Sequence, residues 1–128
     1  MLEDCIFVKQ KGVLKKLHFD HIMVLEAADN YVRFFTDEGT FLVRITLEAA
    51  VKSLPSDKFA RVHRLYAVSI KEISKISNEC LMIRNFENEI PVSKLFYDDF
   101  VKQIKILEAD PPTKDKPDEE DENESQEE

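Results

Sequence analysis

Short apolar runs separated by turn signals fill residues 5–45, and they constrain the fold more than any other feature of this sequence. The runs are rich in Val, Ile, Phe and Tyr, which favour the pleated surface of a strand: CIFVKQ, VLKKLHF, IMVLEAA, YVRFFT and TFLVRI. The chain has only two glycines, Gly12 and Gly39, and each falls between two such runs. Because glycine accepts the positive φ that tight hairpin turns require, this pattern predicts successive antiparallel strands.

The second half of the sequence adds two helical patterns to the strands. An apolar stripe at helical spacing follows Thr46, a good N-cap residue, and Pro55 ends it. Strand-like runs resume in RVHRLYAVSI and EISKIS, and CLMIRN and NEIPV are typical of a further hairpin. A second helical stripe follows Ser93, also a good N-cap residue. The predicted fold class is mainly β with two short α-helices.

The last 20 residues differ from the rest of the chain in composition. Residues 1–108 contain 16 Lys and Arg and 16 Asp and Glu, whereas residues 109–128 contain 2 Lys and 10 acidic residues. The net charge of −8 therefore belongs entirely to this segment, which also has no apolar residue after Ala109. A segment of this kind cannot bury enough apolar surface to offset its ordering entropy. We expect one folded domain over 1–108 and a disordered acidic C-terminal tail over 109–128.

Several classes of protein are disfavoured by what the sequence lacks. It has no apolar run long enough to cross a membrane, and the N-terminal residues do not have the pattern of a signal peptide. The two cysteines, Cys5 and Cys80, lie far apart with no CxxC spacing, which indicates reduced core residues rather than a disulfide framework. We therefore expect a cytoplasmic protein, with no membrane contact from this segment.

Catalytic and metal sites find little support in the sequence. The candidate metal ligands are His18, His21 and His63, but residues three apart on a regular strand point to opposite faces unless a turn intervenes at Asp20. No serine lies in a nucleophile motif, and neither cysteine has a histidine neighbour in the sequence. The sequence predicts no enzyme, no metal site and no cofactor.

Basic and amide side chains recur near the predicted strand ends, at Asn30, Arg33, the segment 61–64 and Lys94. Antiparallel strands bring alternate loops to the same end of a sheet, so these side chains could form one edge. Arginine can pair with phosphate or guanine, and asparagine can pair with adenine. These groups favour a surface that meets a polyanion, although His63 could instead be a partly buried structural residue.

Three segments carry a resemblance to a known family: EAADNYVRF, FARVHRLYAVSI and NEIPVSKLF. Their order and spacing over about residues 5–104 resemble the LytTR-type DNA-binding domain of bacterial transcriptional regulators. The resemblance implies an elongated arrangement of antiparallel β-sheets with two small helices. It also implies that loops, rather than a recognition helix, enter successive major grooves of direct-repeat promoter sites and bend the DNA.

The resemblance places three DNA-facing loops on this sequence, around Asp29 to Val32, at His63 and Arg64, and at Ser93 and Lys94. The site residues it implies are Asn30, Tyr31, Arg33, His63, Arg64, Ser93 and Lys94. The chain departs from the family at Lys94, where arginine is usual, at Leu65, where serine is common, and at Ser69, where asparagine is common. A lysine can contact phosphate or a single base acceptor, but it lacks the planar two-pronged geometry of guanidinium.

The partners implied are double-stranded DNA at promoter direct repeats, a second copy of the domain on DNA, and an upstream receiver or sensor domain in a full-length chain. Too few residues precede Phe7 for a receiver domain, so the sequence is that of a stand-alone regulator or of a fragment. Two alternatives remain open. The domain could be a protein-interaction module on the same fold without DNA binding, and the acidic tail could be solubilising or could compete with DNA for the basic surface.

Overall fold

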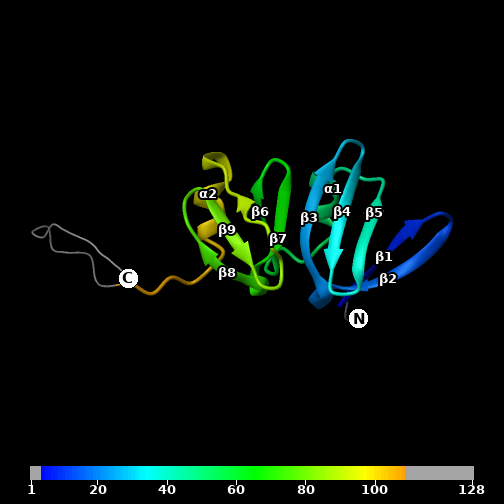
Figure 1. Ribbon diagram of the computed structural model, residues 1–128, viewed down its shortest axis with the longest axis horizontal. Coiled ribbons are helices and arrows are strands. Elements are labelled where there is room, and N and C mark those ends of the chain that lie inside the picture. The colour runs from blue at the N-terminus through cyan, green and yellow to red at the C-terminus, as the bar shows by residue number, and fades with distance from the viewer. Residues whose placement is uncertain (1–3, 109–128) are drawn as a thin grey trace, which may run out of the picture.

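The computed structural model describes residues 4–108, and Figure 1 shows their arrangement. The expected disordered tail, 109–128, lies outside the described residues. The described elements, in chain order, are β1 (Cys5–Gln10), β2 (Val13–His18), the 3-10 helix η1 (Phe19–His21), β3 (Ile22–Ala28), β4 (Tyr31–Thr36), β5 (Gly39–Val43), α1 (Leu47–Lys52), β6 (Phe59–His63), β7 (Tyr66–Ser69), the 3-10 helix η2 (Ile70–Glu72), β8 (Ile73–Ile76), β9 (Cys80–Ile83), β10 (Ile90–Pro91) and α2 (Lys94–Val101).

The strands form three antiparallel sheets laid out along the long axis of the molecule (Figure 1). A five-stranded sheet in the order β5-β4-β3-β7-β6 occupies the centre. The β1–β2 hairpin lies at one end, and the three-stranded sheet β10-β9-β8 lies with α2 at the other. The prediction of a mainly β fold with two short helices and elongated antiparallel sheets is confirmed.

The central sheet buries apolar side chains on both of its faces, because neighbouring residues of a strand point in opposite directions. Leu25 and Phe34 pack on one face in a core that includes Leu47 of α1 and Leu17 of the β1–β2 hairpin. The other face carries a second core, to which the three-stranded sheet and α2 contribute: Val24, Ala60, Val62, Val68, Leu81, Ile83, Ile90, Val92 and Phe100. Two cores on one sheet hold its strands in a fixed register, and this positions the turns at its ends.

Both helices begin at the residues predicted as N-caps, but only one of these caps is made by a side chain. Thr46 Oγ1 accepts a hydrogen bond from the Ala49 N–H at 3.1 Å. Ser93 occupies the N-cap of α2 without a side-chain cap bond, and its buried Oγ has no hydrogen-bond partner among the described residues. The two caps therefore differ in what they contribute to stability.

The turns follow the sequence prediction where glycine marks them. Gly12 and Gly39 have φ of 81° and 132°, and both lie at hairpin turns as predicted. The run RVHRLYAVSI, by contrast, is not one strand. It breaks into β6 and β7 at Arg64 and Leu65, where neither glycine nor proline marks a turn.

None of the helices described within residues 4–108 is long and apolar enough to span a membrane.

Candidate nucleic-acid interface

Two hairpin turns lie together at one end of the central sheet. Asp29 and Asn30 connect β3 to β4, and Arg64 and Leu65 connect β6 to β7. Because β3 and β7 are paired antiparallel, the end of β3 lies beside the start of β7, and the Ala27 N–H donates to the Leu65 carbonyl oxygen at 2.8 Å. Both turns appear at the upper edge of the molecule in Figure 1.

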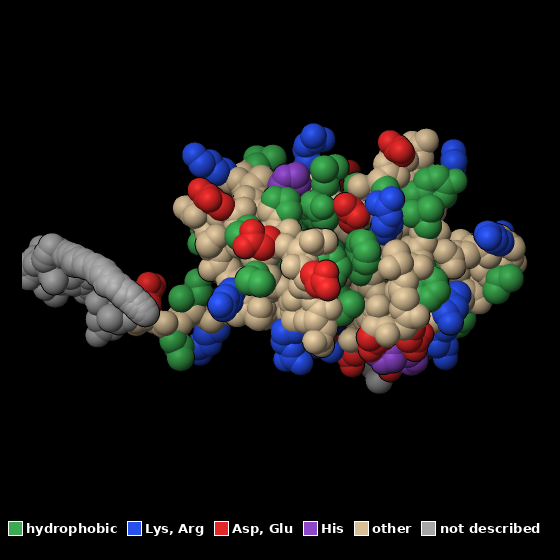
Figure 2. Space-filling model, viewed as in Figure 1, with side chains coloured by type: hydrophobic (Ala, Val, Ile, Leu, Met, Phe, Trp, Pro, Cys, Tyr) green, Lys and Arg blue, Asp and Glu red, His purple; other side chains and the backbone are tan. Residues whose placement is uncertain are grey.

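The start of α2 is attached to the same end of the sheet. The Ser93 N–H donates a hydrogen bond to the Val62 carbonyl oxygen at 2.9 Å, next to His63 at the end of β6. Lys94, the first residue of α2, therefore lies near the β6–β7 turn. The structure thus brings the three predicted segments to one edge, where Figure 2 shows several Lys and Arg side chains.

The predicted site residues differ in how much of their side chains they expose. Asn30, Arg33, Arg64 and Lys94 are exposed, and Tyr31 is 37% exposed. His63 and Ser93 are partly buried, and the Ser93 Oγ is covered. Four polar or charged side chains are therefore open to a partner at this edge.

Arg33 is held within the sheet by a cross-strand network. Its Nη1 lies 3.2 Å from Glu26 Oε1, and the Tyr66 hydroxyl donates to Glu26 Oε2 at 2.9 Å. Burial, together with this hydrogen bond to Glu26, raises the pKa of the Tyr66 hydroxyl. The carboxylate of Glu26 offsets part of the Arg33 charge, which leaves Arg33 less available to a phosphate than Arg64 or Lys94.

Arg61 holds the β6–β7 turn in place, a role that the sequence does not reveal. Its Nε donates to the His63 carbonyl oxygen at 3.2 Å and its Nη2 donates to the Arg64 carbonyl oxygen at 2.8 Å. The guanidinium also lies 5.1 Å from the centroid of the Phe96 ring in α2. One side chain thus links the turn to the helix that carries Lys94.

His63 also supports this turn. Its Nδ1 accepts a hydrogen bond from the Leu65 N–H at 3.1 Å, and its ring lies edge-on to Tyr66 at 5.8 Å between centroids. An imidazole that accepts at Nδ1 carries its proton on Nε2. Burial lowers the pKa of His63, and the charges of Arg64 and Arg61 lower it further. The structural role that the sequence left open for His63 is therefore present, beside any contact with a partner.

Comparison with known proteins fits this geometry. Residues 12–105 match the family model described as the LytTr DNA-binding domain. The chain belongs to the LytTR family of DNA-binding domains. A solved structure described as the LytTr DNA-binding domain of a response regulator from Bacillus cereus is 25% identical to it. That likeness covers 79% of this chain and 96% of the other, with a TM-score of 0.68. No curated protein sequence matches this chain.

The matched family is described as a DNA-binding domain, so the edge that carries these segments is the candidate interface. The family resemblance identifies the two turns and the start of α2 from the sequence. It misses Glu26, Tyr66 and Arg44, because their roles depend on which strands are paired. Arg44 lies with its guanidinium 5.9 Å from the centroid of the Tyr31 ring. Its sequence signal is a position directly after β5, which can be matched to Tyr31 once the hairpin register is known.

The histidines of this LytTR domain lie in two separate places. The 3-10 helix η1 is the turn at Asp20 that the sequence left open, and it brings the His21 ring to 5.4 Å from the His18 ring, centroid to centroid. His63 lies at the other end of the central sheet, because His21 precedes β3 whereas His63 lies beside its end. The three histidines therefore do not converge.

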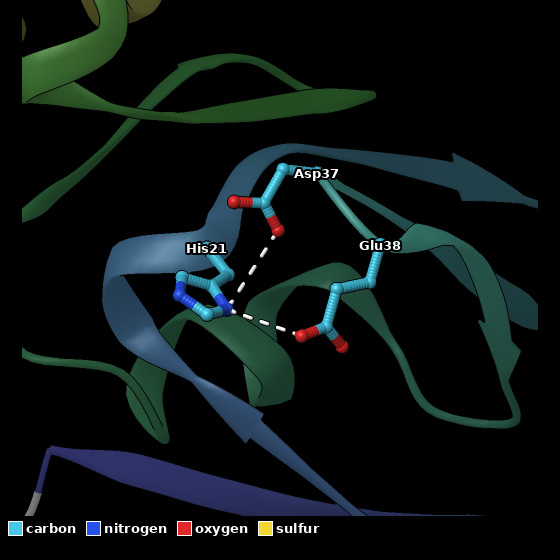
Figure 3. Close-up of side chains that lie close together, drawn as sticks. All are labelled: His21, Asp37 and Glu38. Atoms are coloured by element: carbon cyan, nitrogen blue, oxygen red, sulfur yellow. Dashed lines mark ion pairs between the residues drawn. The ribbon is translucent and has the colours of Figure 1, made fainter.

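His21 instead lies among carboxylates of the β4–β5 turn. Its Nδ1 is 3.7 Å from Asp37 Oδ1 and 3.5 Å from Glu38 Oε2, and Figure 3 shows both side chains directed toward that nitrogen. The ligand atoms of these three residues lie within 4.8 Å of one another, so they are the described residues that could hold a cation. The carboxylates are 57% and 50% exposed, and contacts between groups as exposed as these contribute little to stability.

Proposed function

We propose that this LytTR domain reads DNA sequence through three segments that enter successive major grooves at paired direct repeats. The segments are the β3–β4 turn, the β6–β7 turn and the start of α2. The observation that carries this proposal is their convergence on one edge of the central sheet, fixed by the β3–β7 pairing and by the bond from Ser93 to Val62. An elongated molecule that presents protrusions along one edge suits one face of a duplex.

Arg64 is the residue that we assign to base reading in the second turn. Its side chain is exposed, and its own carbonyl oxygen is held by Arg61 at 2.8 Å. A guanidinium on a fixed backbone loses less entropy when it pairs with the O6 and N7 atoms of guanine. A preorganised turn of this kind suits sequence reading better than a mobile one.

The other site residues receive separate roles in the proposal. Asn30, exposed on the first turn, pairs with a base edge, since an amide can bond both N6 and N7 of adenine. Lys94 contacts a phosphate or a single base acceptor at the third segment. Ser93 positions Lys94, because its Oγ is covered. Tyr31 and Arg33 contact the DNA backbone, and His63 both supports its turn and donates from Nε2.

Selection of binding sites from a random pool of duplex DNA tests the proposal. We expect a paired motif to emerge. Inserting about 5 base pairs, half a helical turn, between its halves should weaken paired binding, because the second half then faces the other side of the duplex. A pool that yields no motif would instead favour a protein-interaction module, an alternative supported by the zero net charge of residues 1–108.

Substitution of Arg64 by alanine tests the assigned base contact. The Arg64→Ala variant should lose about 1–3 kcal/mol of preference at particular base pairs, because each good bidentate contact discriminates by that amount. Lys71→Ala is the matched control, since Lys71 is exposed in η2, beyond the other end of β7. If Arg64→Ala kept the wild-type preference at every position, the assignment of Arg64 would be wrong.

The proposal also specifies the setting in which the domain acts. The similar structure from Bacillus cereus is described as part of a response regulator. We infer that an upstream receiver or sensor domain controls this domain in a full-length chain and that two copies meet on paired repeats. For a bacterial regulator of this kind the site of action is the chromosome, in the cytoplasm.

A further inference from the structure

A groove separates the tip of the β1–β2 hairpin from the outer strand β5, on the side of the molecule away from α2. Its volume is about 530 Å³. Three cationic side chains and no acidic side chain line it, and the lining residues are Lys9, Gln10, Lys11, Tyr31, Leu42 and Arg44. We call it the hairpin groove. None of its three cations belongs to the DNA-reading segments described above.

The hairpin groove is built by specific contacts between two sheets. Gln10 Nε2 donates to the Leu42 carbonyl oxygen at 3.0 Å, which ties the tip of the hairpin to β5. The β4–β5 register pairs Val32 with Val43, so Arg44 lies across from Tyr31. The Arg44 guanidinium lies 5.9 Å from the centroid of the Tyr31 ring. Since Tyr31 directly follows the β3–β4 turn, the groove is continuous with the proposed DNA-reading edge.

The charges in the groove are available to an external anion. Lys9, Lys11 and Arg44 are all exposed, and none forms an ion pair with any residue in the described range 4–108. Arg33, on the neighbouring strand, is instead paired with Glu26. Three unpaired cations that converge on one concave surface favour an anionic ligand.

We propose that the hairpin groove binds the phosphate backbone of the DNA segment that flanks the site read by the β3–β4 turn. The proposal rests on the proposed function and extends the interface beyond it. Cations and an amide suit phosphate oxygens, whereas they would find few partners on an apolar protein surface. Continuity with the reading edge through Tyr31 favours the flanking duplex over an unrelated acidic partner.

Backbone binding has a signature that differs from base reading. Each neutralised phosphate releases counterions, so it makes the negative slope of log K against log salt steeper by about 0.9, independently of sequence. The hairpin lies at one end of the elongated molecule, so only one flank of a half-site can reach the groove (Figure 1). Affinity should therefore depend on the length of DNA on that side alone.

The test uses the full chain and duplexes that carry one half-site of the selected motif. One duplex ends at the motif, and two others extend it by about one helical turn, 10 base pairs, on either side. We expect wild-type affinity to rise several-fold on one of the two extended duplexes. The Lys9→Gln/Lys11→Gln variant should lose that gain in affinity, yet bind the short duplex as wild type does. On the extended duplex its plot of log K against log salt should be shallower by about 0.9 for each lost phosphate contact.

Lys71→Gln/Lys75→Gln is the control, because it removes the same charge from two exposed lysines outside the groove. It should keep the gain from the flank. Arg44→Gln gives a second variant of the groove and should also reduce the gain. If the extended duplex raised the affinity of the groove variant as much as that of the control, the proposal of a backbone contact would be overturned, while base reading would be unaffected. If selection from random duplex DNA yielded no motif, the proposed function itself would be wrong, and the groove proposal with it.

Discussion

At the scale of single residues, the β6–β7 turn depends on two side chains that hold its backbone. Arg61 binds the carbonyl oxygens of His63 and Arg64, and His63 binds the Leu65 N–H. These bonds replace the glycine that a two-residue hairpin commonly uses. The turn that presents Arg64 is therefore fixed by neighbours, and changes in those neighbours should reach DNA binding indirectly.

We predict that Arg61→Met lowers the free energy of unfolding by about 1–3 kcal/mol, because two carbonyl oxygens lose a charged donor and the Phe96 ring loses the guanidinium beside it. Chemical denaturation measures this change. Arg64→Met is the control, since Arg64 is exposed and its side chain makes no hydrogen bond within the described residues. Equal stabilities of the two variants would show that the bonds from Arg61 do not stabilise the turn.

We also predict that His63 titrates below the ordinary histidine pKa of about 6.5, because burial and the charges of Arg64 and Arg61 disfavour the imidazolium. Below that pH the unfolded chain binds more protons at this position than the folded chain does. The contribution of His63 to the free energy of unfolding should therefore fall as the pH drops from about 6.5 toward the folded-state pKa.

An NMR titration of the imidazole signals measures this pKa, and the His63→Gln variant identifies the signal by its loss. A midpoint at or above the ordinary value would contradict the arrangement of the turn. A protonated Nδ1 can no longer accept the hydrogen bond from the Leu65 N–H. The Leu65 amide signal should therefore shift over the same pH range.

At the scale of elements, the two α-helices begin with the same kind of residue but in different environments. The Thr46 hydroxyl caps α1, whereas the Ser93 hydroxyl is buried at the start of α2 without a partner among the described residues. The start of α2 is instead held by the backbone bond from Ser93 to Val62 and by Arg61 against Phe96. Packing fixes α2, and a local cap stabilises α1.

We predict that Thr46→Ala lowers the free energy of unfolding by about 1 kcal/mol, the usual cost of losing an N-cap side chain. Ser93→Ala is the matched substitution at the other helix, and it should leave stability unchanged or slightly raised, since a buried hydroxyl without a bond is unfavourable. Thermal unfolding of the two variants measures the contrast. A larger loss for Ser93→Ala would indicate a hydrogen bond from its hydroxyl beyond those seen within residues 4–108.

At the scale of the whole molecule, the central sheet separates two chemically different ends. The β3–β4 and β6–β7 turns lie at one end, and the opposite end carries His21, Asp37 and Glu38. Figure 2 shows His and acidic side chains gathered at one place on that lower edge, with Lys and Arg side chains elsewhere along it. We expect this contrast to orient the domain on DNA, because a histidine and two carboxylates attract a polyanion less than the basic side chains beside the two turns do.

Deletion of residues 110–128 tests whether charge outside the domain affects DNA binding. That segment carries the entire net charge of −8. We predict that its removal raises non-specific affinity at low salt and has little effect at high salt, where long-range repulsion is screened. Binding to DNA of random sequence at two fixed salt concentrations measures this. Unchanged affinity at low salt, with reduced solubility, would assign the segment a solubilising role.

The sequence by itself determined the fold class, the limits of several strands and the positions of two hairpin turns. The runs IMVLEAA and YVRFFT became β3 and β4 with the predicted limits, and Gly12 lies in a hairpin turn whereas Gly39 directly follows one. These features depend on residues close together in the chain, namely alternating apolar side chains and glycine at positive φ. Local chemistry was enough to predict them.

Only the tertiary structure decided the details of the interface. The break at Arg64, the pairing of Arg33 with Glu26 and the position of Arg44 beside Tyr31 depend on which strands are paired and in which register. The 3-10 turn that brings His18 to His21 is likewise not encoded by strand periodicity. A register that brings together residues far apart in sequence is set by the two cores of the central sheet, so local patterns cannot reveal it.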